Sequence, residues 1–465
     1  MSEERPRRRV SLTTFEGTVD RGTYAFYGVV LALIKYNIDR LLSASMLGTA
    51  WYPQHYFYPP IPVKFDLLSQ QQVIFYETML LLAVPFIWFG TSLTVRRLRD
   101  AGLNPSWILL FFVPVLNLIS FFLLSVLPSA ADTSSDEAQN SMLYRMMPES
   151  ALGSAALGCL LSTILGLAVV LLSTAVLETY GWGLFVGIPF LCGLLSALLH
   201  NVREPRSTGQ SVLVGMSSVL VLGTVIFGLA IEGVVCLLMA APIGFIVCIP
   251  GALLGKALSR TLRSSSSGAV CGCFALFLPV LMGLERTAVP EPELFEVKTS
   301  IVVNAPPEEV WQFVIEFPKL DVPSNLVFAM GIAYPTEARI EGEGVGAVRY
   351  CTFSTGSFVE PIERWEPPHL LEFSVAENPP PMEEWSVYSN INAPHLDFMS
   401  SRRGRFRIDS LSGGRSLLEG TTWYQHRIWP SWYWKTYSDF IIHQIHLRVL
   451  RHVAIHAEAA AKLAT

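Results

Sequence analysis

The sequence predicts a multi-span α-helical membrane protein that carries an α+β domain at its C-terminal end. Of its 465 residues, 51% are hydrophobic and only 15% are charged, whereas soluble domains carry about 25% charged residues. The charges are also unevenly spread, because only eight lie between Leu152 and Leu284 and ordinary density returns from Glu291 onward. This shift marks the boundary between a part dissolved in lipid and a part dissolved in water.

Eight apolar runs in the first 285 or so residues are long enough, or nearly long enough, to cross a bilayer as helices, which takes about 20 residues each. Trp51, Trp107 and Trp182 stand near the ends of such runs, and tryptophan is enriched at the membrane interface. We therefore expect seven or eight spanning helices. The runs cover residues 24–47, 73–93, 107–127, 152–176, 183–199, 212–229, 233–254 and 268–284.

The distribution of lysine and arginine predicts the orientation, because short basic loops stay in the cytoplasm. The basic groups at 5–9 and 96–99 both lie in the cytoplasm if the first two runs form one hairpin that crosses the membrane twice. If every run crosses and the N-terminus is cytoplasmic, the basic groups at 203–206 and 256–263 lie outside, against the rule. Either one run does not cross, or one loop is an exception to the rule. Eight crossings put the C-terminal domain in the cytoplasm and seven put it outside. We expect an inner-membrane protein whose C-terminal domain is cytoplasmic.

Composition also bounds the domain organisation and the partners. The polar segment 129–150 and the proline-containing segment 286–292 are typical of linkers, which predicts domains at 1–130, 131–290 and 291–465. The net charge of −5 does not favour nucleic acid as a partner. The seven cysteines show neither disulfide nor metal-site spacing, so we expect no metal and no other cofactor.

A basic loop follows the second apolar run and reads Arg96-Arg97-Leu98-Arg99-Asp100. Together with Gly17 and Arg21, it resembles the small bacterial inner-membrane family catalogued as domain of unknown function 805, over roughly residues 12–130. The resemblance implies no activity. We interpret the loop as a cytoplasmic anchor in which Asp100 pairs with Arg96 or Arg97; a binding site for phospholipid headgroups is the alternative.

Three ionisable residues fall within the first two apolar runs. Lys35 and Asp39 are four residues apart, so they share a helix face and can pair, and Glu77 lies early in the second run. Ionisable groups at membrane depth are costly and mark functional sites by default. The alternative is that the first helix is shifted, so that these side chains extend to the interface.

The C-terminal residues follow a strand–helix–strands–helix order. Residues 295–304 alternate like a strand, and the following APPEE sequence at 305–309 opens a helix with proline and acids in its first turn. Gly413-Gly414 predicts a hairpin turn between the last two strands, and a long helix at 431–463 ends the chain. The remaining strand-like runs are 347–355, 357–365, 370–376, 404–410 and 416–427.

This order, with IVVNAPPEEVW at 301–311, Gly344-x-Gly346, RYCTF at 349–353 and LEGTTWY at 418–424, resembles the SRPBCC (START-like, helix-grip) superfamily over about residues 294–463. The resemblance implies an apolar cavity between a curved sheet and the last helix. It also implies binding of a lipid, a polyketide or another hydrophobic molecule. No catalytic residue is shared across that superfamily, so none is transferred here.

Six aromatic residues are candidates for lining such a cavity, although ordinary core packing is the alternative for each. In the last helix, a stripe from Tyr437 through Ile441, Ile445 and Val449 predicts the buried face, and His452 and His456 fall within it. His443 is expected to point away and His446 to lie on a flank. The aromatic candidates are Tyr350, Phe353, Phe358, Phe406, Trp423 and Trp432.

His452 and His456 have two interpretations. One or both face the cavity or pair with a strand acid such as Glu360, or they are ordinary histidines near the helix end. The segment 378–401, with three consecutive prolines and several aromatic residues, is long enough for a lid or a binding loop.

The preferred hypothesis is a membrane-anchored protein that binds, and in one version transfers, a hydrophobic ligand such as a membrane lipid. An enzyme of the cyclase, aromatase or hydrolase type is the second hypothesis, and it requires His452, His456, Glu360 or Glu372 to face one pocket. A membrane-associated sensor or assembly factor is the third.

Overall fold

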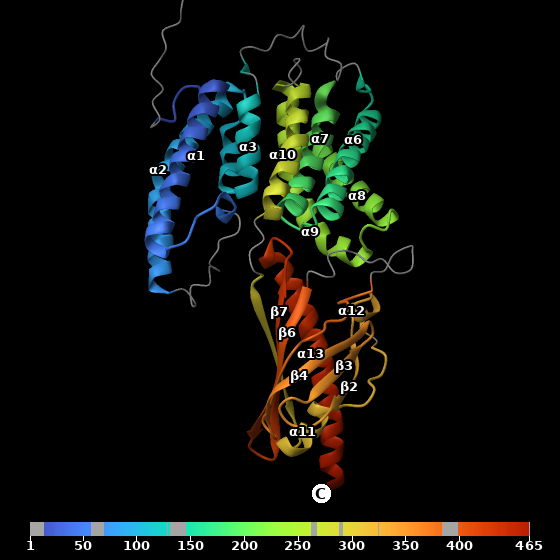
Figure 1. The fold of residues 1–465 in the computed structure, drawn as a ribbon. Helices are drawn as coiled ribbons and strands as arrows, with labels where there is room; N and C mark the ends of the chain where they lie inside the picture. The colour runs from blue at the N-terminus through green and yellow to red at the C-terminus, as the bar shows by residue number, and fades with distance from the viewer. Residues whose placement is uncertain are drawn as a thin grey trace, which may run out of the picture. The chain divides into compact units, whose positions relative to one another are not determined.

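The computed structural model describes residues 14–56, 69–127, 129–130, 146–261, 267–287, 292–323, 325–383 and 399–464 (Figure 1). The chain forms two compact units: residues Met1–Gly223 with Pro242–Pro290, and residues Thr224–Ala241 with Glu291–Thr465. Most of the predicted linker at 129–150 and of the predicted lid at 378–401 lies outside the described residues. The division of the membrane part at residue 130 stays a prediction.

Helices occupy all eight apolar runs. Their starts follow from local capping: the Asp20 side chain accepts a hydrogen bond from the backbone N–H of Thr23, and Ser69 with Gln72 forms a reciprocal capping box. The helices are α1 (Arg21–Leu47), α2 (Gln70–Asp100), α3 (Pro114–Val126), α6 (Ala151–Leu171), α7 (Ile188–Val202), α8 (Thr208–Gly228), α9 (Val234–Thr261) and α10 (Ser267–Thr287).

Five helical segments of the described chain are long and apolar enough to span a membrane. They confirm a membrane-type N-terminal part. Shorter helical pieces extend α7 at η6 (Gly183–Gly187) and α6 at η5 (Leu172–Val176), and η1 (Pro53–Tyr56) follows α1. The five segments are Gln70–Asp100, Ala151–Val176, Gly183–Val202, Thr208–Gly228 and Val234–Ser259.

Helix α7 is the most buried of these segments and packs backbone to backbone against α9. A Cβ atom on Gly251 would overlap the carbonyl oxygen of Phe190, and one on Gly255 would overlap that of Leu194. Only glycine permits this approach, which is the membrane form of helix packing through small residues. The glycine content of the middle helices thus has a direct structural reason.

The third apolar run, 107–127, does not cross the bundle. It folds as a short 3₁₀ helix, η3 (Pro105–Phe112), followed by α3, with a break at Val113 before Pro114. The η3 segment starts four residues after α2 ends, and the end of α3 returns to the same place: the Arg97 side chain on α2 donates to the carbonyl oxygens of Leu124 (2.8 Å) and Leu127.

The lengths of the two pieces agree with this path. Eight residues of 3₁₀ helix rise about 16 Å and thirteen of α-helix about 20 Å, and both fall short of the roughly 30 Å of a hydrocarbon core. The run is thus two short helices with a break between them, and not one helix of spanning length.

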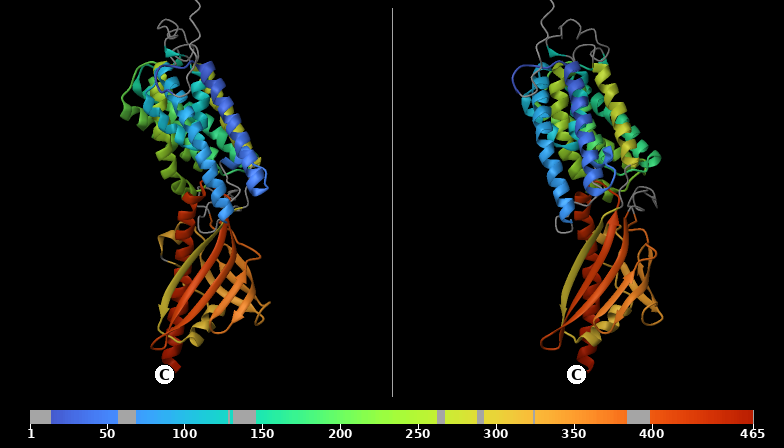
Figure 2. Two further views of the ribbon diagram at one scale, coloured as in Figure 1. Left: turned by 90° about the vertical axis from the view of Figure 1, so that its left-hand side faces the viewer. Right: turned by 60° about the vertical axis from the view of Figure 1, so that its left-hand side comes forward.

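The second unit contains a seven-stranded antiparallel sheet in the order β1-β7-β6-β5-β4-β3-β2, curled around the C-terminal helix α13 (Ser431–Ala464) (Figure 2). Two further helices, α11 (Pro307–Ile315) and α12 (Leu326–Ala329), connect β1 to β2. This arrangement is the predicted helix-grip fold. The strands are β1 (Leu294–Val303), β2 (Pro335–Glu341), β3 (Val348–Phe353), β4 (Gly356–Glu366), β5 (Leu370–Ser374), β6 (Met399–Leu411) and β7 (Arg415–His426).

Most of these strands were predicted, and β2 was not. Gly413 and Gly414 both have a positive φ, +81° and +68°, in the turn between β6 and β7, which confirms the predicted hairpin. Side chains alternate between the two faces of each strand, and the inner face packs on α11 and α13. Its central core includes Val310, Phe317, Ile362, Leu371, Phe373, Ile408, Leu418, Val449, Leu450 and Val453.

The second unit also includes the turn between α8 and α9. Val235, in the first turn of α9, belongs to one apolar cluster with Phe328, Ile332 and Met382, and the Tyr433 hydroxyl donates to the carbonyl oxygen of Met239 at 2.6 Å. Ile441 and Ile445 of α13 pack against the same cluster. Helix α13 therefore contributes to two cores, with Ile445 and Leu450 on different ones.

Candidate functional site

An ion pair lies buried on the inner face of the sheet. Arg349 on β3 faces Glu360 on β4 in the strand register, and its Nη1 donates to the Glu360 carboxylate. The Nε donates to the carbonyl oxygen of Ile315 at 3.1 Å. The guanidinium also interacts with the Cys351 thiol, and its buried Nη2 has no oxygen or nitrogen acceptor among the described residues.

Aromatic rings surround the Arg349 guanidinium. Its Cζ lies 5.6 Å from the ring centroid of Phe317, 5.7 Å from that of Phe373 and 5.5 Å from that of Phe406. These cation–π contacts stabilise a buried guanidinium without using its N–H donors. A strong donor in an apolar surrounding costs free energy unless a partner binds it, so Nη2 marks a place for an acceptor.

Burial controls protonation at this pair. Burial raises the pKa of Glu360, and the adjacent Arg349 charge opposes that rise. Burial also raises the pKa of the neighbouring Cys351 thiol to about 12. The thiol therefore stays protonated at neutral pH, and a thiol is a poor nucleophile compared with a thiolate.

A chain of hydrogen bonds joins α13 to strands β1 and β7 of the sheet. The His446 Nε2 lies 2.7 Å from the Thr422 hydroxyl, and its Nδ1 lies 3.1 Å from the Thr299 hydroxyl. The same Thr299 hydroxyl lies 2.7 Å from Nδ1 of His443. Burial, and secondarily the His443 charge, lowers the pKa of His446 to about 4. The ring is thus neutral, with one donor and one acceptor, and hydroxyl groups satisfy both.

These contacts correct the predicted phase of α13. His443 was expected to point away from the sheet, and His446 to lie on a flank, yet both bind β1 or β7. The predicted four-residue step drifts around a helix of 3.6 residues per turn. The stripe that faces the central core contains Val449, Leu450 and Val453.

Three of the six aromatic candidates lie on the inner face. Phe353 and Phe358 are in edge-to-face contact at 4.8 Å between ring centroids, and Phe406 lies 6.2 Å from Phe373. All three pack against the central core. Whether they contact a ligand stays a prediction.

The other three candidates lie elsewhere. Tyr350 alternates with the inward Arg349 and Cys351 and therefore faces outward. Trp423 lies on the outer face, where its ring is flanked by the guanidinium of Arg405 at 5.0 Å. Trp432 is 66% exposed. These positions do not favour the three as cavity-lining residues: Tyr350 and Trp423 take outward positions of strands, and Trp432 is exposed on α13.

His452 and His456 pack against aromatic rings next to α11. The His452 ring lies 5.9 Å from Phe317 and the His456 ring lies 5.7 Å from Phe313. The carboxylates do not join them: Glu360 binds Arg349, while Glu372 faces outward and pairs with Arg403. The four residues that an acid–base site would require therefore do not converge.

The polar residues of α1 form a local cluster. Lys35 Nζ lies 2.5 Å from both oxygens of Asp39, and the Tyr56 hydroxyl donates to Asp39 at 2.6 Å. Asp39 is fully buried. Glu77, in contrast, is exposed on α2. The expected pair is present, and Trp51 beside Tyr56 places it among the aromatic residues typical of an interface.

The basic loop after α2 ties three segments together. Arg97 is fully buried and pairs with Asp100, as one of the two predicted pairings requires. Its other donors bind the last carbonyl groups of α3, and Ser129 donates to Asp100 at 2.6 Å. Arg97 uses its guanidinium to cap a helix, which favours the anchor interpretation over a headgroup site.

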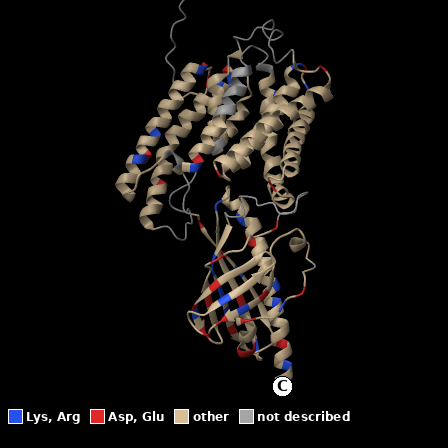
Figure 3. Cartoon of the chain, turned by 45° about the vertical axis from the view of Figure 1, so that its right-hand side comes forward, with Lys and Arg blue, Asp and Glu red and all other residues tan. Residues whose placement is uncertain are grey.

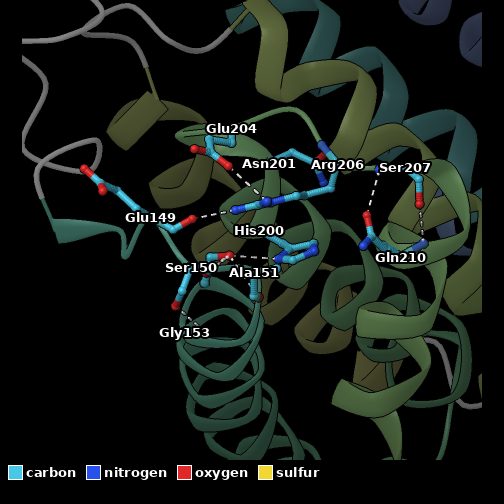
Figure 4. Close-up of polar contacts among 11 residues, drawn as sticks. Glu149, Ser150, Ala151, Gly153, His200, Asn201, Glu204, Arg206, Ser207 and Gln210 are labelled. Carbon is cyan, nitrogen blue, oxygen red and sulfur yellow. Dashed lines mark hydrogen bonds and ion pairs between the residues drawn. The ribbon is translucent and has the colours of Figure 1, made fainter.

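A second polar network joins α6, α7 and α8, and sequence reasoning did not single it out (Figure 4). His200 Nδ1 lies 3.0 Å from the Ser154 hydroxyl, and the side-chain Oδ1 of Asn201 accepts from the backbone N–H of Arg206 at 2.9 Å. Arg206 also donates to the carbonyl oxygen of Glu149 at 2.6 Å. Its bonds link helix ends to one another, so this network closes the α7–α8 loop onto the start of α6.

Comparisons with known proteins address the two ends of the chain separately. Residues 12–135 match the family described as "Protein of unknown function (DUF805)", which confirms the resemblance drawn from the basic loop. A search of curated proteins gave no significant match.

Solved structures similar to part of this chain include three proteins. The ZhuI aromatase/cyclase from Streptomyces sp. R1128 is 15% identical, with 37% of this chain and 98% of that chain covered and a TM-score of 0.25. A protein from Nitrosospira multiformis is 18% identical, with coverages of 36% and 99% and a TM-score of 0.23. Norcoclaurine synthase from Thalictrum flavum is 13% identical, with coverages of 35% and 86% and a TM-score of 0.24. The fold assignment here rests on the strand order described above.

Proposed function

We propose that the C-terminal domain binds an amphiphilic ligand, mostly hydrocarbon with one oxygen-bearing polar group, inside the helix-grip fold. The membrane helices hold this domain next to the bilayer, where such molecules are concentrated. A membrane lipid, or a hydrophobic solute that partitions into the membrane, has this chemistry.

The observation that carries the proposal is the buried Arg349. Its Nη2 donor has no oxygen or nitrogen acceptor among the described residues, while three phenylalanine rings surround the guanidinium. A carboxylate, phosphate or carbonyl oxygen would satisfy that donor, and the phenylalanine rings would contact the hydrocarbon part. The neutral His446 and its two threonine partners add hydrogen-bonding capacity on the helix side.

The enzyme hypothesis receives less support. Its acid–base candidates are divided between the inner and outer faces, and the buried Cys351 thiol keeps its proton because its pKa is raised to about 12. Binding requires none of these groups to react.

Gly420 on β7 offers a test. An added Cβ atom there would lie 3.6 Å from both Leu450 and Phe406, which is ordinary contact, so alanine fits and a larger side chain projects into the interior. The full chain, Gly420→Ala and Gly420→Leu would each be purified in a mild detergent. Bound molecules would be extracted from each and identified by mass spectrometry.

We expect a defined amphiphile with the unsubstituted protein and with Gly420→Ala, and at least a tenfold loss with Gly420→Leu. Lipids attached to the membrane helices would be equal in all three samples and serve as the internal reference. A thermal unfolding curve shows that Gly420→Leu is folded. If a folded Gly420→Leu retained every bound molecule, the proposed interior site would be wrong.

A further inference from the structure

The re-entrant path of η3 and α3 changes the number of membrane crossings. The chain enters this pair beside the end of α2 and leaves it there, because Arg97 on α2 binds the last turn of α3. Asp100 at the end of α2 likewise binds Ser129, which follows α3. Residues 101–130 therefore begin and end on one side, and seven crossings remain in place of eight: the five apolar segments named above together with α1 and α10.

Contacts between the remaining helices fix their directions. Helices α6 and α7 are antiparallel, since Ser154 meets His200 while Gly166 lies next to Cys192. Helices α6 and α8 are parallel, because Cys159 donates to Val214 and Ser162 bonds to Ser218.

The same reasoning orients α9 and α10. Helices α7 and α9 are parallel, since Phe190 meets Gly251 and Leu194 meets Gly255. Helix α10 is antiparallel to α7, because the Glu285 carboxylate accepts from the backbone N–H of Gly183 at 3.1 Å. The end of α10 therefore lies beside the start of α7, opposite the end that carries Arg203.

The basic loops consequently gather at one end of the first unit. Leu98 and Leu127, beside the α2 loop, line one small pocket together with Leu254 and Leu258 of α9, and Lys256 donates to Thr208 at the start of α8 at 2.7 Å. Figure 3 shows charged residues mainly at the helix ends. Among the described residues, the basic ones at this end include Arg96, Arg97, Arg99, Arg203, Arg206 and Lys256, against Lys35, Arg40 and Arg286 in the segments toward the other end.

We infer that the basic end is cytoplasmic and that the C-terminal domain faces the opposite side of the membrane. With seven crossings, every basic loop obeys the positive-inside rule, and the conflict among the loops disappears. Residue 291 follows the end of α10, which lies at the non-basic end. This placement replaces the cytoplasmic domain expected from eight crossings.

The topology has one consequence that rests on the proposed function: the ligand enters the domain from the non-cytoplasmic compartment. The topology itself does not depend on any ligand, so the test below fails or succeeds separately from the binding test.

Single cysteines in the full chain, in intact cells whose outer envelope is permeable to small molecules, test the topology. Ser412→Cys is exposed in the β6–β7 turn of the C-terminal domain, and Gly209→Cys is exposed at the basic end. Ser106→Cys and Ala130→Cys, both exposed, flank the re-entrant pair. The probe is a membrane-impermeant maleimide applied before and after lysis, with the unsubstituted protein as the background.

We expect Ser412→Cys to react in intact cells, and the other three variants to react at least tenfold more after lysis than before. Labelling of Gly209→Cys and Ser412→Cys from the same side would overturn the inference. Opposite sides for Ser106→Cys and Ala130→Cys would overturn the re-entrant path. Reaction of Ser412→Cys only after lysis, with the other three reactive in intact cells, would overturn the assignment of the cytoplasmic side.

Discussion

The membrane unit and the helix-grip domain are packed by opposite means. In the membrane unit, the closest contacts are between backbones, at Gly251 against Phe190 and at Gly255 against Leu194. In the helix-grip domain, the core consists of large side chains such as Trp311. Burying apolar surface away from lipid contributes no favourable free energy, so membrane helices associate through close packing and polar contacts. Burying apolar surface away from water stabilises a fold by about 25 cal/mol per Å².

The contrast extends to polar groups. The membrane helices use short links between small side chains, such as Ser162 to Ser218 at 2.6 Å. The helix-grip domain buries a full ion pair, Arg349 with Glu360. Changes in the size or polarity of a side chain should therefore have different effects in the two regions. Four substitutions test this difference.

The largest effect is expected for Gly251→Leu in α9. Its Cβ atom alone would overlap the Phe190 carbonyl oxygen, and a rigid helix backbone cannot move aside as a side chain can. We expect little or no monodisperse protein in detergent. Gly223→Leu on α8, where nothing lies within 4 Å of an added Cβ, is the matched control. Equal losses in both variants would contradict packing by backbone contact.

The second effect concerns the buried ion pair. Arg349→Met leaves the Glu360 carboxylate buried without its partner, and such a loss costs about 3–5 kcal/mol. The double variant Arg349→Met/Glu360→Leu should recover most of that free energy of unfolding. Chemical denaturation of the full chain in detergent measures the domain's transition. Arg407→Met, on the solvent-facing pair with Asp409, is the control; if the double variant were no more stable than the single one, the pair would not behave as buried.

A smaller effect is expected for Leu450→Ala in α13. Leu450 is fully buried in the central core, and large-to-alanine changes at such sites cost about 2–5 kcal/mol. Ile455→Ala, on the same helix but 67% exposed, should change the free energy of unfolding by less than about 0.5 kcal/mol. The same denaturation measurement compares the two, and the reverse ranking would show that the helix phase is wrong.

The smallest effect is a dependence on pH. Burial lowers the pKa of His446 from its ordinary value of 6.5 to about 4. Between those values the unfolded chain binds a proton that the folded domain does not, so stability falls as the pH decreases through this window. From pH 6.5 to pH 5 the loss is about 2 kcal/mol.

His426, whose pKa burial also lowers to about 4, contributes a similar loss. Burial lowers the pKa of His452 as well, so His446→Gln should remove a part of the dependence, measured as the thermal midpoint of the domain against pH. An unchanged pH profile in His446→Gln would show that this ring is not buried as neutral imidazole.

The two regions also differ in how far the sequence predicts them. The helices of the membrane part were found by length and hydropathy, and the helix-grip order followed from strand alternation and Gly413-Gly414. The re-entrant run was missed because 107–127 has the length and hydropathy of a span. Pro114 alone could not reveal the break, because α2, α9 and α10 continue through internal prolines such as Pro85 and Pro242.

The candidate site was predicted less well. Phe353, Phe358 and Phe406 lie on the inner face as predicted. Arg349 was not predicted as a site residue, because it stood out only as part of a family motif. An arginine between two strand positions looks solvent-exposed in a sequence. Its burial depends on Glu360, which reaches it only after β3 and β4 pair, and such tertiary pairing has no local signal.

The re-entrant pair gives the membrane unit a cross-section that changes with depth. At about 16–20 Å, η3 and α3 fill little more than one leaflet of a bilayer whose hydrocarbon core is about 30 Å thick. The leaflet on the basic side therefore accommodates two more helical segments than the opposite leaflet does. A protein that displaces unequal areas of lipid in the two leaflets acts as a wedge, and it is accommodated most easily where the membrane bulges toward the wider end. On the inferred topology, the Val113–Pro114 break thus makes the membrane unit wider in the leaflet on the basic side.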